Sequence, residues 1–445
     1  MKAIETIKNI WKIEELKNRI LLTLGLLLVY RFGAQIVLPG IDASQLANLS
    51  QQTDSGLLGL LNAFTGGAFS NASVFALGIM PYISASIVVQ LMGIAIPYLQ
   101  KLQKEGESGR RKINQITRWL TIAITLVQGP GYILNLYNIL PAEAFVLGND
   151  MTFVVSSVII LATGCVFAMW LGEKITDKGI GNGISLLIMV GIIARLPLAF
   201  IQEWVSRVTE SNGGLIMILI ELVIWFVLIL LSILLVMAVR QIPVQYARRT
   251  ASGSYERNVF GSRQYIPLKL NASGVMPIIF AQAIMFIPAA AIGLSDSAMA
   301  QSIASEFKNI FGFWYNFVFG LLIIIFTYFY TAITVPTNKM ADDLKRSGGF
   351  IAGIRPGTET AEYLDRIMSQ ITLPGSIFLA LIAVFPAIAV SILGMQTGWA
   401  LFYGGTSLLI LVGVAIDTMQ QVNSYLLNRH YDGLMKTGKN RKAVA

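Results

Sequence analysis

The sequence predicts an all-α integral membrane protein with ten transmembrane helices. Hydrophobic residues make up 55% of the 445 residues and charged residues only 13%, whereas soluble domains carry about 25% charged residues. A helix that crosses a bilayer needs about 20 consecutive apolar residues. Stretches of this kind lie near residues 20–38, 72–98, 119–139, 152–172, 181–200, 214–239, 272–295, 313–336, 370–393 and 399–422.

The positive charges predict how these helices are oriented. The chain holds 33 Lys and Arg and has a net charge of +9, and 29 of these cations fall in the chain ends or in every second connection. Cytoplasmic loops of membrane proteins carry such an excess of Lys and Arg. We therefore expect a multi-pass protein with both termini in the cytoplasm, and no sequence-specific binding of nucleic acid.

The segments outside the spans are polar or amphipathic. In residues 1–19, Ile4, Ile7 and Trp11 recur at helical spacing among Lys and Glu, which predicts an amphipathic helix on the cytoplasmic membrane surface. Residues 423–445 are expected to form a cytoplasmic tail. The longest predicted cytoplasmic loops are 240–269 and 338–368.

The region that contains the second span differs from an ordinary transmembrane helix. Glycines interrupt it after a short apolar segment, and Ile79 and Ile83 then follow four residues apart. Residues at this spacing lie on one face of a helix. Breaks in a helix at membrane depth are tolerated only where the backbone is buried in protein or lines a cavity. Residues 64–90 are therefore predicted to form part of a pore.

The residue inventory excludes several kinds of site. The chain has one Cys, Cys165, and one His, His430, so neither a His/Cys metal cluster nor a His-based catalytic triad can form. We expect no cofactor and no enzymatic activity. Residues 179–183 read GIGNG but lack both a preceding strand and a following Gly-Lys-Ser/Thr, so they predict a turn that leads into a helix rather than a phosphate-binding loop.

Ionisable residues inside the spans are few. Such residues mark ion and proton pathways in coupled transporters, and the candidates here are Arg31, Glu221 and Asp417. Glu221 and Asp417 are expected toward the ends of their spans, while Arg31 lies deeper and is expected to have a structural partner on another helix. This pattern favours a passive conduit over an ion-coupled transporter.

Five sequence blocks resemble the SecY family of bacterial protein translocon channels. In chain order they are FALGIMPYISAS at 75–86, KEGESGRRK at 104–112, GIGNGIS at 179–185, IRPG at 354–357 and GGTSLLI at 404–410. They extend from the second span to the tenth. The resemblance implies a protein-conducting channel of the bacterial plasma membrane that passes unfolded secretory polypeptides and releases transmembrane segments laterally into lipid.

The resemblance also implies the architecture. The family has two five-helix halves of inverted topology, which form a clamshell around an hourglass-shaped pore. Here the halves would be residues 20–205 and 206–422. A lateral gate toward the lipid would open between spans two and three on one side and seven and eight on the other.

Four sets of site residues follow from the resemblance. The pore ring would be Ile79, Ile83, Ile188, Ile279 and Ile410. The plug, about residues 57–67, would comprise Leu57, Leu58, Gly59, Leu60, Leu61, Asn62, Ala63, Phe64, Thr65, Gly66 and Gly67. The lateral gate would use Ser84, Ser86, Gln90, Asn271 and Gln282, and a motor or ribosome would contact Arg248, Arg249 and Arg355.

The implied partners are SecE, SecG, the SecA motor ATPase, the ribosome and polypeptides that carry a signal sequence, together with membrane lipid. Two alternatives remain open. A ten-span secondary transporter of a small solute would need a polar site at the membrane midplane, where the aligned positions are isoleucines. An insertase or scaffold without a continuous pore would differ from a channel in its conductance after removal of the plug.

Overall fold

The computed structural model describes residues 13–46, 56–146, 151–209, 214–246, 264–292 and 309–441, and these are mostly helical. Within those ranges ten helices overlap the ten predicted spans. They are α2 (Glu14–Gly33), α5 (Met80–Ala95), α7 (Glu107–Ile139), α8 (Met151–Lys178), α9 (Gly183–Thr209), α10 (Gly214–Met237), α11 (Met276–Ile292), α13 (Phe313–Thr334), α15 (Thr358–Leu393) and α17 (Gly405–Arg441). Shorter helical elements are η1 (Ala43–Gln45), α4 (Gly56–Thr65), α6 (Pro97–Lys104), η2 (Ala142–Ala144), α14 (Thr337–Arg346) and α16 (Thr397–Ala400).

Most of these helices are long and apolar enough to cross a membrane. Among the described residues seven qualify, and an eighth is added if Met80–Gly93 and Pro97–Gln103, bent by 101°, form one broken span. Helix α2 begins with Glu14 and Glu15 in its first turn, and only its apolar remainder resembles a span. Most of the predicted surface helix at 1–19 lies outside the described residues.

Several helices are longer than the predicted spans. Helices α7, α15 and α17 have 33, 36 and 37 residues, and at about 1.5 Å per residue each exceeds the roughly 30 Å of a bilayer's hydrocarbon core. Their extensions are polar, as in the ESGRRK sequence that opens α7. These helices therefore continue beyond the apolar run that the sequence marks.

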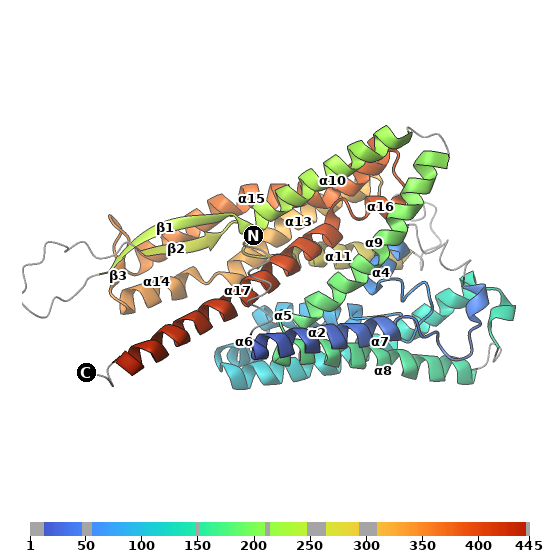
Figure 1. The fold of residues 1–445 in the computed structure, drawn as a ribbon, viewed down its shortest axis with the longest axis horizontal. Coiled ribbons are helices and arrows are strands. Elements are labelled where there is room, and N and C mark those ends of the chain that lie inside the picture. Colours follow the sequence, from blue (N-terminus) through green and yellow to red (C-terminus); the bar gives the residue numbers. More distant parts are fainter. Residues whose placement is uncertain are drawn as a thin grey trace, which may run out of the picture. The chain divides into compact units, whose positions relative to one another are not determined.

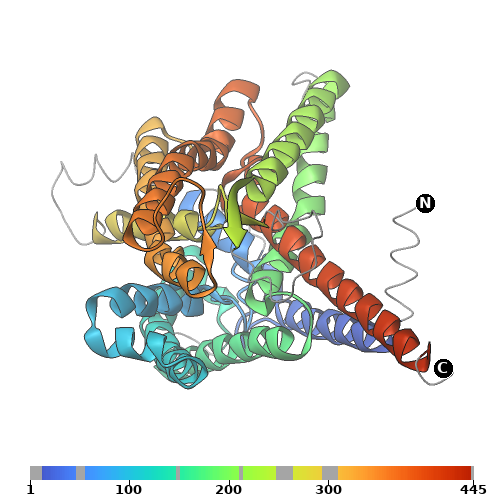
Figure 2. The same cartoon turned by 90° about the vertical axis from the view of Figure 1, so that its left-hand side faces the viewer.

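The chain divides into two compact units. The first comprises Met1–Glu210, Gln396–Leu401 and Ile410–Ala445, and the second Ser211–Met395 and Phe402–Leu409. In the first unit α7 packs against α5 and α8 (Figure 1), and α9 contacts α2, α4 and α8. In the second unit α13 lies between α11 and α15 (Figure 2), and α10 contacts α15.

Aromatic and aliphatic side chains fill the core of the first unit. Phe69, Tyr132, Leu136 and Phe153 belong to one buried cluster. The Tyr132 hydroxyl donates a hydrogen bond of 2.9 Å to the carbonyl oxygen of Phe69. Since lipid is as apolar as these side chains, such close packing and interhelical hydrogen bonding, rather than water exclusion, hold membrane helices together.

The predicted loops 240–269 and 338–368 contain a small antiparallel sheet that the sequence analysis did not predict. Strand β1 (Val239–Tyr246) pairs with both β2 (Gln264–Lys269) and β3 (Gly349–Phe350), so the strand order is β2-β1-β3; the three strands are labelled in Figure 1. Ile242 pairs with Ile266. A proline in each of the longer strands, Pro243 and Pro267, hides the pattern because proline is normally depleted in strands.

A hydrophobic cluster supports this sheet. Ile242 and Val244 from β1 and Leu268 from β2 are buried together with Leu344 of α14 and Leu364 of α15. The alternation along β1 places every second side chain on the same face. The sheet and the two helices thus form a packed platform at one end of the second unit.

Candidate pore, plug and contact loop

The predicted pore segment is non-helical before α5 begins. Residues 66–79 form successive turns, so the second span is shorter than the predicted 72–98. Ala68, Ala72 and Ala76 in these turns are fully buried, and Ala72 has a positive φ of 43°. A positive φ is strained for a residue with a side chain. The broken backbone is therefore surrounded by protein, which is the condition under which such a break is tolerated inside a membrane.

The first two predicted ring residues stand one turn apart. Ile79 caps the N-terminus of α5, with Pro81 in the first turn, a position where proline costs the helix no hydrogen bond. The Ile83 amide donates a hydrogen bond of 3.0 Å to the Ile79 carbonyl oxygen, so the two side chains share a face. Ile79 is 4% exposed.

The other predicted ring residues lie on three different helices. Ile188 of α9 and Ile410 of α17 are buried, and Ile279 of α11 is half-buried. Ile79, Ile83, Ile188 and Ile410 belong to the first unit and Ile279 to the second. Membership of a common ring stays a prediction for all five.

A short helix, α4, occupies the predicted plug segment. It ends at Thr65, and Gly66 and Gly67 follow with φ of 66° and 89°, a conformation that glycine adopts without strain. The Gly67 amide bonds to the Asn62 carbonyl oxygen at 3.0 Å, which satisfies an end of the helix. The buried Asn62 side chain accepts a hydrogen bond of 3.1 Å from the Ser70 amide.

The end of α4 is fastened to two longer helices. Arg31 Nη1 of α2 donates a hydrogen bond of 2.8 Å to the Gly66 carbonyl oxygen. A Cβ on Gly66 would lie 2.6 Å from the Cα of Gly191 in α9. The partner of Arg31 is thus the backbone of the predicted plug segment rather than a side chain of another span. Its signal in the sequence was a lone arginine deep in an apolar run, which marks a residue with a specific partner.

The predicted gate residues lie on α5 of the first unit and on or just before α11 of the second unit. On α5, Gln90 Nε2 is 3.4 Å from Ser86 Oγ, and Ser84 is half-buried. Asn271 precedes α11 and accepts a hydrogen bond of 3.2 Å from Ser273, and Gln282 is buried within α11. Their role as a gate stays a prediction.

The predicted contact loop presents an arginine on a rigid base. Arg355 lies between β3 and α15, is 88% exposed and has Glu359 3.7 Å away. Gly353 and Gly357, with φ of 85° and 121°, allow the tight path of this loop. The Arg355 carbonyl oxygen accepts a hydrogen bond of 2.8 Å from the Thr360 hydroxyl. The other two predicted contacts, Arg248 and Arg249, lie outside the described residues.

The side chains of Ile351 and Ile354 anchor this loop to the hydrophobic cluster that supports the sheet. Ile351 is buried in the cluster beneath the sheet, and Ile354 packs against that cluster. The guanidinium of Arg355 therefore projects from a base of β3, α14 and α15 rather than from a free loop.

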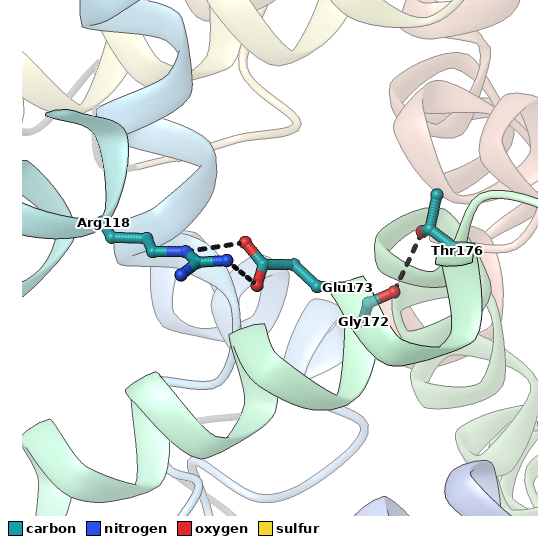
Figure 3. Close-up of polar contacts among 4 residues, drawn as sticks. All are labelled: Arg118, Gly172, Glu173 and Thr176. Atoms are coloured by element: carbon teal, nitrogen blue, oxygen red, sulfur yellow. Dashed lines mark hydrogen bonds and ion pairs between the residues drawn. The ribbon is translucent and has the colours of Figure 1, made fainter. Parts of the chain in front are cut away.

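Helices α7 and α8 are joined by an ion pair that the sequence analysis did not identify. Arg118 Nε and Nη2 bond to the two carboxylate oxygens of Glu173 at 3.1 and 2.6 Å (Figure 3). This bidentate geometry is the strong form of an arginine–carboxylate pair. Near it, Thr176 donates a hydrogen bond of 2.9 Å to the Gly172 carbonyl oxygen. Within the described ranges, no three His, Cys, Asp or Glu residues are grouped as a metal site would require.

Comparison with known proteins shows which family this chain resembles. A family model described as SecY matches residues 73–419. The protein translocase subunit SecY of Streptomyces scabiei is 40% identical over 437 residues, which cover 96% of this chain and 98% of the relative.

Two solved channels have a similar fold. One is a SecY protein whose plug domain stabilises the closed state of the translocation channel and maintains a membrane seal. It has a TM-score of 0.58, 17% identity and 91% coverage of both chains. The other is Sec61 in the canine ribosome–channel complex, with a TM-score of 0.53, 16% identity and the same coverage.

Proposed function

The chain belongs to the SecY family, and from this premise we propose how a protein-conducting translocation channel divides its work among these residues. The chain is a multi-pass membrane protein and a channel subunit, not an enzyme. A secondary transporter of small solutes, the alternative that the sequence left open, finds no support in the comparisons.

The channel must pass an unfolded chain without leaking ions. A ring of charged side chains would select ions, whereas an apolar constriction excludes them by dewetting. Ile79, Ile83, Ile188, Ile279 and Ile410 form this seal in our proposal, because van der Waals contact adapts to any passing side chain. The observation that carries this proposal is the placement of Ile79 and Ile83 one helical turn apart, on one face, at the start of α5.

The plug and the gate complete the cycle. Helix α4 closes the outer funnel in the idle state and leaves it during transport. Ser84, Ser86 and Gln90 of α5 and Asn271 and Gln282 of the second unit line the lateral exit. Polar contacts between membrane helices contribute only about 0.6 kcal/mol each, which suits an interface that parts for a signal sequence or a transmembrane segment.

The localisation and partners extend the same proposal. The distribution of Lys and Arg supports an orientation with both termini in the cytoplasm, and the bacterial SecY relatives support a place in the bacterial plasma membrane. The exposed loop with Arg355 would then face a SecA motor or a ribosome, with Arg248 and Arg249 contributing nearby. SecE and SecG are the expected membrane partners. Solved Sec61 from a ribosome–channel complex supports the ribosome as a partner.

Reconstitution tests the function directly. The chain is placed in proteoliposomes with SecE and SecG, and SecA, ATP and an unfolded secretory precursor are added outside. Protection of the precursor from protease is expected only when all components and an intact signal sequence are present. Uptake that persists without this chain would refute the proposal.

A further inference from the structure

The GIGNG turn between α8 and α9 binds three other helices through its backbone. The amides of Ile180, Gly181 and Gly183 donate to Thr23 of α2, Gln421 of α17 and Thr176 of α8 at 3.1, 2.8 and 2.9 Å. As predicted, the turn leads into α9. Asn182 Oδ1 accepts hydrogen bonds from the amides of Ile184 and Ser185 at 3.2 and 3.4 Å, which caps the helix.

The contact with α17 is apolar as well as polar. The buried Ile180 packs with Val422 of α17 and Leu16 of α2. Gly181 has a φ of 82°, and a Cβ there would lie 3.1 Å from Thr418 Oγ1. The start of α9 is thus fitted closely to residues near 418–422.

The other end of α9 is fastened to the connection that precedes α17. Glu203 and Arg207 form a buried ion pair of 2.8 Å, with side chains 2% and 5% exposed. The second carboxylate oxygen of Glu203 accepts a hydrogen bond of 2.8 Å from the Gln396 amide. Gln396 Nε2 also lies 3.2 Å from Ser206 Oγ. Removing one partner of a buried ion pair is strongly destabilising, because the other charge is left buried without compensation.

Aromatic packing reinforces this second fastening. Trp399 of α16 is buried, and its ring lies 5.3 Å from that of Phe200 in α9. All residues of both fastenings belong to the first compact unit. Between the two fastenings lie Ile188 on α9 and Ile410 on α17.

We propose that α9 is a splint that holds residues 396–399 at one of its ends and residues 418–422 at the other, and thereby sets the spacing of Ile188 and Ile410 within the first unit. The Glu203 carboxylate, the backbone amide of Gln396 and the side chain of Gln421 are the positioning groups in this account. The inference rests on the proposed function, because it assigns Ile188 and Ile410 to the pore ring. It predicts that loosening either end lets the two isoleucines drift apart, so the idle channel leaks.

The test uses two variants at one position. Gln396 has a φ of −62°, which a proline ring accepts, so Gln396→Pro removes the amide donor to Glu203 while Gln396→Ala keeps it. Both lose the contact with Ser206. Spin labels on Ile193→Cys and Ala415→Cys, in a Cys165→Ala background, report the distance between α9 and α17 in the SecE–SecG complex.

A broadened or longer label distance and a several-fold higher ion leak are expected for Gln396→Pro, and neither for Gln396→Ala. An unchanged distance in the proline variant would overturn the splint. If that variant fails to accumulate in membranes, Gln421→Met and Gln421→Glu repeat the comparison. The glutamate keeps an acceptor for the Gly181 amide and the methionine does not, and equal distances in these two variants would overturn the inference.

Failure of the splint and failure of the pore ring give different results. A leak in Ile83→Asn with unchanged label distances in Gln396→Pro refutes the splint alone. A changed distance in Gln396→Pro with no leak in either variant refutes the assignment of these isoleucines to the seal.

Discussion

Arg31 Nη1 of α2 donates a hydrogen bond of 2.8 Å to the carbonyl oxygen of Gly66, so an arginine within the first span is fastened to the end of α4, the proposed plug. A hydrogen bond to a charged group contributes about 1.5–3 kcal/mol. In the proposed cycle, the bond therefore favours the seated position of α4 over the displaced one.

Replacing this arginine is expected to release the plug. Arg31→Met keeps an apolar stem but donates no hydrogen bond, and about 1.5–3 kcal/mol corresponds to a roughly 10- to 100-fold larger displaced population. Single-channel recording should show correspondingly more frequent idle openings. Arg31→Lys, which keeps a donor, should fall between Arg31→Met and the unmodified protein. Equal opening frequencies in all three would contradict the latch.

The close approach of Gly66 and Gly191 gives an independent prediction. A Cβ on Gly191 would lie 2.8 Å from the Phe64 carbonyl oxygen, and overpacking of this kind costs about 1–3 kcal/mol. Gly191→Ala should push α4 from its seat and increase idle leak. Gly25→Ala in α2, where nothing lies within 4 Å of the new atom, is the matched control. A leak that is the same in both variants would show that this contact does not seat the plug.

The apolar nature of the seal can be tested within the proposed ring. Ile83→Asn and Ile410→Asn should raise ion leak and admit precursors with defective signal sequences, because polar side chains let water enter the constriction. Ile83→Leu and Ile410→Leu keep the apolar surface and should change neither. Normal leak and normal stringency in both asparagine variants would remove these residues from the ring.

Variants of Arg355 test whether the loop requires the planar guanidinium or only a positive charge. Its planar guanidinium can form two parallel hydrogen bonds to one partner, which lysine cannot. Loss of one charged hydrogen bond corresponds to about a tenfold or greater loss of binding affinity. Arg355→Lys should therefore reduce SecA-driven uptake nearly as much as Arg355→Glu, with SecE association unchanged. Arg346→Lys, on the exposed face of α14, is the control. Full uptake with Arg355→Lys would leave charge alone as its role.

The spans were predictable because each is a long local run of apolar residues. The turn at 179–183 was also predictable, since its glycines and Asn182 act through local geometry. The sheet around β1 was not, because its strands are separated by many residues and both carry proline. Pairing across such a distance depends on the buried cluster of Ile242, Val244 and Leu268, which no local pattern specifies.

Partners of polar residues were the least predictable part of the site. The sequence marked Arg31 as unusual, but the carbonyl oxygen that it binds becomes available only because Gly66 turns away from helical geometry. The contacts of Glu203 with Gln396 and of Gly181 with Gln421 join residues about 190 and 240 positions apart in the chain. Only the packed fold brings these groups together.

Conductance after removal of the plug tests the central claim most directly. A variant that lacks residues 57–67 is reconstituted with SecE in a planar bilayer, beside the full-length protein. A channel sealed by α4 above an apolar ring should show frequent transient openings in the variant and few in the full-length protein, because the ring alone reseals incompletely. Assembled, membrane-inserted variant complexes that conduct no more than a protein-free bilayer would contradict a continuous pore through this chain.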